Sequence, residues 1–206
     1  KLSYTVADFK EEIYPSLSGA DKKLIDLFYL KFDNDNVLKL LKNKEAEIDT
    51  RGNFPAKELL ENISAIRESG LVDSKLFPAH LATFITGYYT NASLEEDPRV
   101  LENESSALYY AYGMKSSNKF IAAWFEFNLI HNNVFDALIA RKYKIDISQS
   151  IVGNTEIEDA LRTSGARDFG LTGEDDYYDQ LAKISEIAEL LEREKKTDQL
   201  KRNWIE

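Results

Sequence analysis

Glycine and proline are scarce in this chain of 206 residues, and their positions constrain its fold more than any other feature. The sequence holds 9 Gly and 4 Pro, and these fall where apolar residues at helical spacing begin or end. No segment sustains the alternation of apolar and polar residues that a half-buried strand requires. We therefore expect an all-α fold, a helical bundle with few strands.

Capping residues set the expected helix boundaries. Thr5 with Asp8 and Ser18 with Asp21 predict two capping boxes, and Gly70 predicts a helix end. The expected helices cover residues 6–14, 24–44, 55–70, 74–89, 104–112, 118–144, 154–165 and 174–205. Residues 33–36 are poor helix formers and predict a kink or break. Residues 90–104 predict a loop between two halves, and the last helix reads as a long charged arm, in a hairpin or a coiled coil.

Part of the chain resembles another part, which predicts an internal repeat. Residues 28–49 and 125–146 align without a gap and share Phe28/Phe125, Asn36/Asn133, Val37/Val134, Leu41/Leu138, Ile48/Ile145 and Asp49/Asp146. Each copy predicts one helical stripe that contains a cation: Val37, Leu41, Lys44 and Ile48, then Val134, Leu138, Arg141 and Ile145. We expect a first repeat over residues 1–92, a second over 93–170 and a C-terminal helical arm over 171–206.

The polar members of the repeat have two interpretations each. Lys44 and Arg141 either complement the dipole and the free carbonyls of a helix end, or bridge repeats and grip a partner. Asn36 and Asn133 either restart a helix after a kink, or are buried and hydrogen-bonded, in which case they fix how neighbouring helices meet.

The residue inventory predicts neither a catalytic site nor a cofactor or metal site. The chain has no Cys, its 2 His are far apart in sequence, and no glycine-rich phosphate loop is present. A net charge of -10 disfavours nucleic acid, and no apolar run reaches the length of a membrane span. A further hypothesis is an enzyme that uses the paired tyrosines Tyr88, Tyr89, Tyr109 and Tyr110. Such pairs are more typical of side-chain packing.

The first copy of the repeat resembles a motif of the V-type ATPase C subunit, which is called the d subunit in eukaryotes. The motif reads Phe28-Tyr29-x-x-Phe32-Asp33-x-x-Asn36-Val37, followed by Lys44. In that family an Asp-x-x-Asn-aliphatic turn precedes a Lys or Arg by two helical turns. Asp33, Asn36 and Lys44 match in the first copy. In the second copy Asn133 and Arg141 match, but Ile130 replaces the aspartate.

The whole chain resembles a compact bacterial family encoded with V-type ATP synthase subunits. Segments that carry this resemblance are residues 1–5, 27–33 and 160–171. It implies a non-catalytic central-stalk component that couples the rotor shaft to the membrane rotor ring. It also implies a cytoplasmic location peripheral to the inner membrane. Neither end looks like a natural terminus, so we expect a fragment with sequence missing on both sides. The C subunit has three repeats, whereas this chain shows two and a C-terminal arm. A helical-repeat adaptor that binds peptides or partner helices is the alternative.

Overall fold

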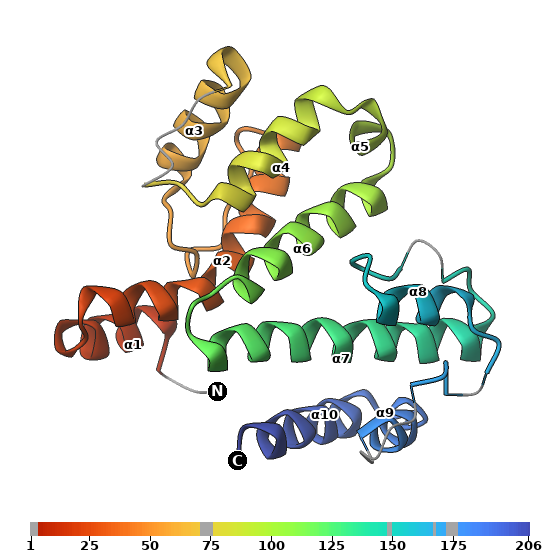
Figure 1. Ribbon diagram of the computed structural model, residues 1–206. Coiled ribbons are helices and arrows are strands. Elements are labelled where there is room, and N and C mark those ends of the chain that lie inside the picture. The colour runs from red at the N-terminus through yellow and green to blue at the C-terminus, as the bar shows by residue number, and fades with distance from the viewer. Residues whose placement is uncertain (1–3, 71–75, 148–149, 167, 172–176) are drawn as a thin grey trace. The chain divides into compact units, whose positions relative to one another are not determined.

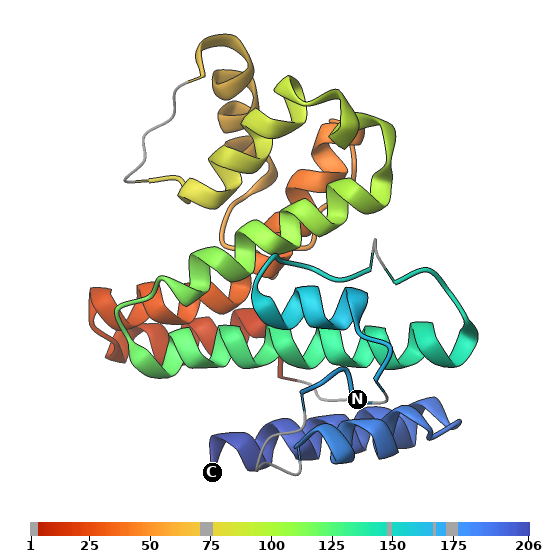
Figure 2. The same cartoon turned by 45° about the vertical axis from the view of Figure 1, so that its right-hand side comes forward.

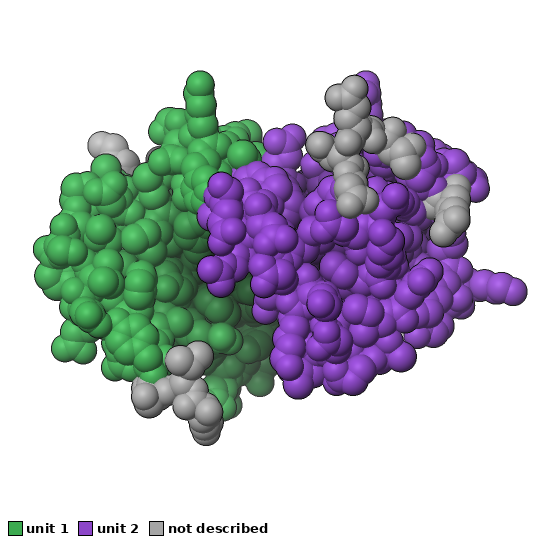
Figure 3. All heavy atoms as spheres, turned by 90° about the horizontal axis from the view of Figure 1, so that it is seen from below, with its two compact units in different colours: residues 1–123 green, residues 124–206 purple. Residues whose placement is uncertain are grey.

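The computed structural model describes residues 4–70, 76–147, 150–166, 168–171 and 177–206, and these residues form helices and no strand (Figure 1). The predicted all-α fold is therefore confirmed. The chain divides into two compact units, residues 1–123 and 124–206 (Figure 3). The boundary falls within one long helix, and the predicted boundaries after residues 92 and 170 lie inside these units. Each unit is described separately below.

The first unit contains most of the helices. They are α1 (Val6–Ile13), the short 3-10 helix η1 (Tyr14–Ser16), α2 (Gly19–Lys42), α3 (Ala56–Ser69), α4 (Ala79–Thr90), α5 (Ala92–Glu96) and α6 (Pro98–Met114). Thr5 and Asp8 form the predicted capping box of α1, and Gly70 ends α3 in the left-handed conformation, as predicted. The predicted start of the fourth helix at residue 74 lies outside the described residues.

Two predictions for the first unit are wrong. Helix α2 runs without interruption through residues 33–36, because Asp33 and Asn36 bond to groups outside the helix and so do not compete for its own backbone. Residues 90–104 form α5 and the start of α6 instead of a loop. The side chains of Asn91 and Asp97 cap these two helices.

The core of the first unit lies between α2, α3, α4 and α6, with α4 against both α3 and α6. Its members are apolar side chains at helical spacing: Val37, Leu40, Leu59, Ile63, Ile66, Phe77, Leu81, Phe84, Ile85, Leu94 and Leu101. Burial of side chains of this size contributes about 1.5–3 kcal/mol each relative to exposure, which holds the unit together.

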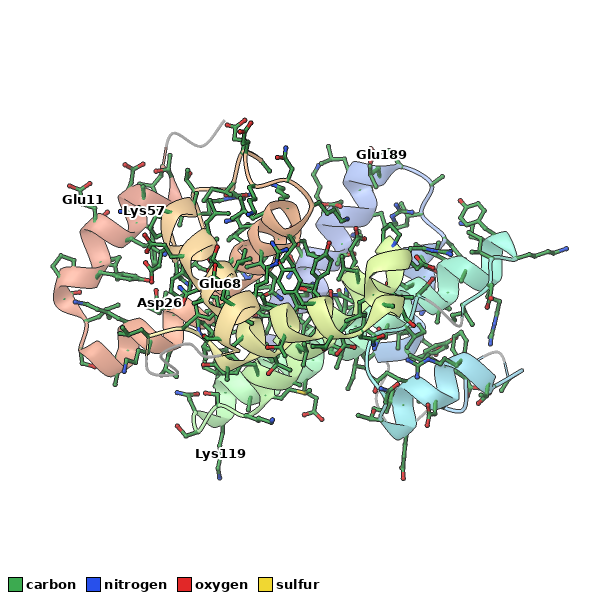
Figure 4. All side chains as sticks on the ribbon, turned by 90° about the horizontal axis from the view of Figure 1, so that it is seen from above. Glu11, Asp26, Lys57, Glu68, Lys119 and Glu189 are labelled. Carbon is green, nitrogen blue, oxygen red and sulfur yellow. The ribbon has the colours of Figure 1, made fainter. Side chains whose placement is uncertain are left out.

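The second unit surrounds the greater part of α7 (Lys119–Tyr143), with α8 (Glu156–Thr163), α9 (Tyr177–Ser185) and α10 (Leu190–Ile205). The predicted single helix of the C-terminal arm is two helices, α9 and α10. Its predicted start at residue 174 lies outside the described residues. Glu189, labelled in Figure 4, caps the start of α10. The core consists of Val134, Ala137, Ile151, Leu161, Phe169, Tyr178, Leu181, Ile184 and Leu200.

The repeated segments end their helices earlier than predicted, so neither forms the proposed four-residue stripe. Helix α2 stops at Lys42, since Asn43 is extended and its side chain accepts a hydrogen bond from the backbone N–H of Glu45 at 3.0 Å. Helix α7 stops at Tyr143, since Lys144 has φ 55° and the Ile145 N–H donates to Ala140 O at 2.9 Å. The second arrangement is a Schellman-type helix end.

Candidate functional site: two loops pinned by buried asparagines

Asn36 pins the loop that follows α2 in the first unit. Its Nδ2 donates to the Asp49 carbonyl at 2.9 Å, and its Oδ1 accepts from the Asp49 N–H at 2.7 Å. One side-chain amide thus satisfies both backbone polar groups of one residue. Asn36 is fully buried, so these bonds replace the water that the amide loses on folding.

Asp33, one helical turn before Asn36, holds the next part of the same loop. Its fully buried carboxylate accepts from the backbone N–H groups of Asn53 at 2.9 Å and Phe54 at 3.1 Å. Burial raises the pKa of Asp33 to about 6, although these hydrogen bonds oppose the shift. A Cβ at Gly52 would meet Asp33 Oδ1 at 2.4 Å. The loop can approach this closely only because position 52 has no side chain.

Asn133 does the same in the second unit with a different loop. Its Nδ2 donates to the Val152 carbonyl at 2.7 Å, and its Oδ1 accepts from the Val152 N–H at 2.9 Å. The same Nδ2 lies 3.2 Å from Glu158 Oε1. Glu158, itself almost fully buried, also accepts from the Thr155 N–H at 2.8 Å in a capping box at the start of α8.

We call these two arrangements the Asn36 pin and the Asn133 pin. Each combines a buried asparagine, a buried carboxylate and a close glycine, since a Cβ at Gly153 would lie 3.3 Å from the Glu158 carboxylate. The carboxylates come from different places in the chain, because Ile130 occupies the position equivalent to Asp33. Sequence reasoning missed Glu158. The signal was present in Thr155-x-x-Glu158, a capping box one residue after the predicted helix start at Asn154.

The two predicted cations do different things. Arg141 donates to the carbonyls of Ala166 at 2.7 Å and Ser164 at 3.1 Å, and its guanidinium lies 3.7 Å from the centre of the Phe169 ring. It therefore binds the loop after α8 rather than the end of its own helix. Lys44 is exposed beyond the end of α2, and its side chain has no hydrogen bond or ion pair with any described residue.

A second buried polar cluster of the first unit was not predicted. The Asn34 side chain contacts two groups: its Oδ1 lies 2.9 Å from His80 Nε2, and its Nδ2 donates to the Ser105 carbonyl at 3.1 Å. Burial lowers the pKa of His80 to about 4, so the ring is neutral at pH 7. The ring packs against Tyr112 at 4.6 Å between centroids. Its sequence signal is weak, because burial of a lone histidine follows from tertiary packing.

Each pair of adjacent tyrosines makes a ring contact. Tyr88 and Tyr89 contact each other edge to face with centroids 5.2 Å apart, and the Tyr109–Tyr110 centroids are 5.3 Å apart. The Tyr109 hydroxyl lies 3.5 Å from the Leu27 carbonyl. Within the described ranges, no group of three acidic or histidine side chains could hold a metal ion. Nor does any helix there combine the length and apolarity of a membrane span.

The fold and the pins define a class: an all-α protein in which long helices fix their following loops through buried asparagines. The chain belongs to the family described as "Protein of unknown function (DUF2764)", which it matches over residues 1–206. No curated protein and no solved structure matches the chain significantly.

Proposed function

We propose that this protein is a non-catalytic coupling component of a V-type ATPase or ATP synthase, similar to the C subunit of such complexes. In this role it binds the rotor shaft and the membrane rotor ring from the cytoplasmic side, peripheral to the inner membrane. The observation that carries the proposal is the pair of asparagine pins. They lie on the residues through which the sequence resembles the motif of the C subunit, Asp33-x-x-Asn36 and Asn133.

The burial pattern of the two long helices supports the same proposal. Aligned positions are buried in both α2 and α7: Leu30/Phe127, Asn34/His131, Asn36/Asn133, Val37/Val134 and Leu40/Ala137. A component that transmits torque needs bodies that resist deformation. The buried, hydrogen-bonded Asn36 and Asn133 contribute to this, because displacing one leaves an unsatisfied group at a cost of about 1–3 kcal/mol.

Exposed apolar side chains on the second unit supply a candidate docking surface for this role. Tyr143 and Ile145 at the end of α7 are 63% and 58% exposed, and Leu190 and Leu191 at the start of α10 are 59% and 60% exposed. Lys142 Nζ donates to the Ser185 carbonyl at 3.3 Å, which ties the end of α7 to the turn before α10. Exposed apolar residues that lie close together are typical of protein interaction sites, and we propose that these four form such a site.

Co-purification with the shaft and ring subunits of a bacterial V-type ATP synthase tests the proposal. Co-expressed wild-type chain is expected to elute with them in size-exclusion chromatography. The double variant Leu190→Ser/Leu191→Ser should lose this association by tenfold or more and keep its helical circular dichroism. Leu76→Ser, an exposed leucine of the first unit, is the matched control and should still associate.

The helical-repeat adaptor is the outcome that would replace this proposal. It predicts that the chain elutes separately from every rotor subunit and that the leucine variant loses binding to unrelated helical peptides instead. The double variant Lys44→Ala/Arg141→Ala separates docking from folding at the predicted cations. We expect the double variant to assemble more weakly than its loss of thermal stability, measured against Arg141→Ala alone, would explain.

A further inference from the structure

A cavity of about 400 Å³ lies between α7 and α10 in the second unit. Figures 1 and 2 both show α10 running alongside α7, and residues of both helices line the space. Its volume falls within the range of small-molecule sites, about 300–1,000 Å³. Nothing in the pins or in the proposed coupling role uses it.

Three side chains that line this cavity have hydrogen-bond donors without a partner among the described residues. The guanidinium of Arg193 lies 5.8 Å from the centre of the Phe135 ring, and neither a carboxylate nor a carbonyl there accepts from it. Thr197, one helical turn further along α10, likewise has no bonded partner for its hydroxyl. The third is the Nε2 of His131, which is a donor in one of the two neutral tautomers of the ring.

The state of His131 follows from its surroundings. Burial, and then the positive charge of Lys201, lower the pKa of His131 to about 4, so the ring is neutral at pH 7. Burial raises the pKa of Tyr177, whose hydroxyl stays protonated and lies 2.6 Å from His131 Nδ1. In the neutral tautomer in which the phenol donates to Nδ1, the single imidazole proton is on Nε2, which can then donate to a ligand.

The charges of the cavity are sorted by exposure. Arg193 and Lys201 are partly buried, whereas Asp136, Glu194 and Asp198 are exposed. Among the charged groups that line the cavity, the cations are thus the less exposed and the carboxylates the more exposed. A ligand that satisfies both sets has an anionic end and a cationic end. A dianion would meet repulsion from the exposed carboxylates and from the chain's net charge of -10.

We propose that the cavity between α7 and α10 binds a zwitterion, with a carboxylate held by Arg193, Thr197 and His131 and an ammonium group facing the exposed acids. Arginine suits the less exposed position because its planar fork donates two parallel hydrogen bonds to a carboxylate. The same chemistry is carried by a free amino-acid-like molecule and by neighbouring Glu and Lys side chains of a partner helix.

Titration of the isolated full chain with three probes of equal carbon number tests the site without reference to rotor subunits. The probes are 4-aminobutyrate, butyrate and succinate at constant ionic strength, followed through the Arg193 Nε–Hε and His131 ring NMR signals. We expect saturable shifts, with 4-aminobutyrate binding at least fivefold tighter than butyrate and butyrate tighter than succinate. A plain anion site would give the reverse order, with succinate first, and that result overturns the proposal.

Three variants localise the binding. Arg193→Gln should abolish the shifts of every probe at the His131 signal, while Arg202→Gln, an exposed arginine of the same helix paired with Glu206, should leave them unchanged. The double variant Glu194→Gln/Asp198→Asn should bring 4-aminobutyrate and butyrate to within twofold of each other. Shifts that persist in Arg193→Gln, or the absence of saturation in the wild type, would refute the site.

A blocked helical peptide with Glu and Lys four residues apart distinguishes the two sources of the ligand. Binding at least tenfold tighter than 4-aminobutyrate, and lost in Arg193→Gln, assigns the site to a partner protein. Weaker binding than 4-aminobutyrate assigns it to a free small molecule.

Discussion

The Asn36 pin and the Asn133 pin reach the same result with different sets of residues. In the first unit the asparagine and the carboxylate both belong to α2, and together they hold residues 49–54. In the second unit the carboxylate comes from α8, where Glu158 also caps its own helix. The asparagine is therefore the feature that the two pins share. The carboxylate can come from either side of the loop, provided that a glycine leaves room for it.

The close contact at Gly52 gives the largest expected effect. Gly52→Ala places a methyl group 2.4 Å from Asp33 Oδ1 and 3.1 Å from Asn36 Nδ2. The Asn36 pin must then open and leave two buried polar side chains unsatisfied. We expect a loss of about 3–5 kcal/mol in the unfolding free energy of the first unit. Amide hydrogen exchange in α2 and α3 measures that loss.

Two glycine controls sharpen this prediction. Gly19→Ala meets no atom within 4 Å at the start of α2 and should stabilise the helix by about 0.5–1 kcal/mol. Gly153→Ala has φ +96° and a carboxylate at 3.3 Å, so it should cost about 1–3 kcal/mol in the second unit only. Equal effects of Gly52→Ala and Gly19→Ala would show that the Asn36 pin does not constrain the loop.

Converting each asparagine to aspartate compares the pins directly. Asn133→Asp replaces a donor with an oxygen 3.2 Å from Glu158 and 2.7 Å from the Val152 carbonyl, and Asn36→Asp faces the Asp49 carbonyl at 2.9 Å. We expect each variant to cost about 2–4 kcal/mol at pH 7. The cost should shrink towards pH 5, since a protonated carboxyl restores a donor. Urea unfolding at both pH values, with α2 and α7 followed separately by hydrogen exchange, checks this.

If the loss of stability in the Asn→Asp variants does not depend on pH, the shape of the side chain rather than its hydrogen-bond donor determines the stability of the pin. Asn62→Asp is a suitable control, because among the described residues the Asn62 amide bonds only to the Glu58 carbonyl of its own helix, at 2.9 Å. It should change stability by less than about 1 kcal/mol, as an exposed or half-buried helical position does.

The sequence predicted the helical class and several caps, because these depend on short-range patterns. It singled out Asn36 and Asn133 but left open whether they are buried and hydrogen-bonded or restart a helix after a kink, and the structure shows both buried. The box at Thr5 and the left-handed Gly70 follow from local chemistry alone. The continuity of α2 could not be predicted, since Asp33 and Asn36 favour helix only after a distant loop accepts their bonds. The capping role of Glu158 has a local signal at Thr155, but its bond with Asn133, 25 residues away, has none. The end of α7 before Lys144 could not be predicted, because the left-handed position after a helix is usually occupied by glycine and here is occupied by a lysine.

Acid should affect the two units differently. The pKa values of His80 and His131 are lowered to about 4. The unfolded state therefore binds the proton first, and each histidine removes up to about 3 kcal/mol of stability as pH falls from 6.5 to 4. The pKa of Asp33 is raised to about 6, so in the first unit protonation of the native carboxyl opposes this loss over the same range. We expect the second unit to lose more protection than the first.

Residue-by-residue NMR titration checks these directions. Asp136 must be followed too. The residue as a whole is exposed, but desolvation of its carboxyl raises its pKa, which opposes the effect of His131 in the second unit. His131→Gln should flatten the acid response of the second unit. A native pKa near 6.5 for either histidine would contradict the burial that the structure assigns to it.

The smallest expected changes in stability concern Lys44 and Arg141, the two cations that occupy equivalent positions in the predicted repeat. Arg141→Ala removes two hydrogen bonds to the Ser164 and Ala166 carbonyls and the contact over Phe169. Since the arginine is largely exposed, we expect a loss of about 1–2 kcal/mol in the second unit. Lys44→Ala should change the first unit by less than about 0.5 kcal/mol, because the side chain is exposed beyond the helix end. Thermal unfolding of the two single variants measures both. Equal losses in the two variants would show that Lys44 and Arg141 play equivalent roles, as the predicted repeat implied. Arg141→Lys keeps the charge but cannot bond both carbonyls in the same geometry, so it should recover less than half of the stability lost in Arg141→Ala.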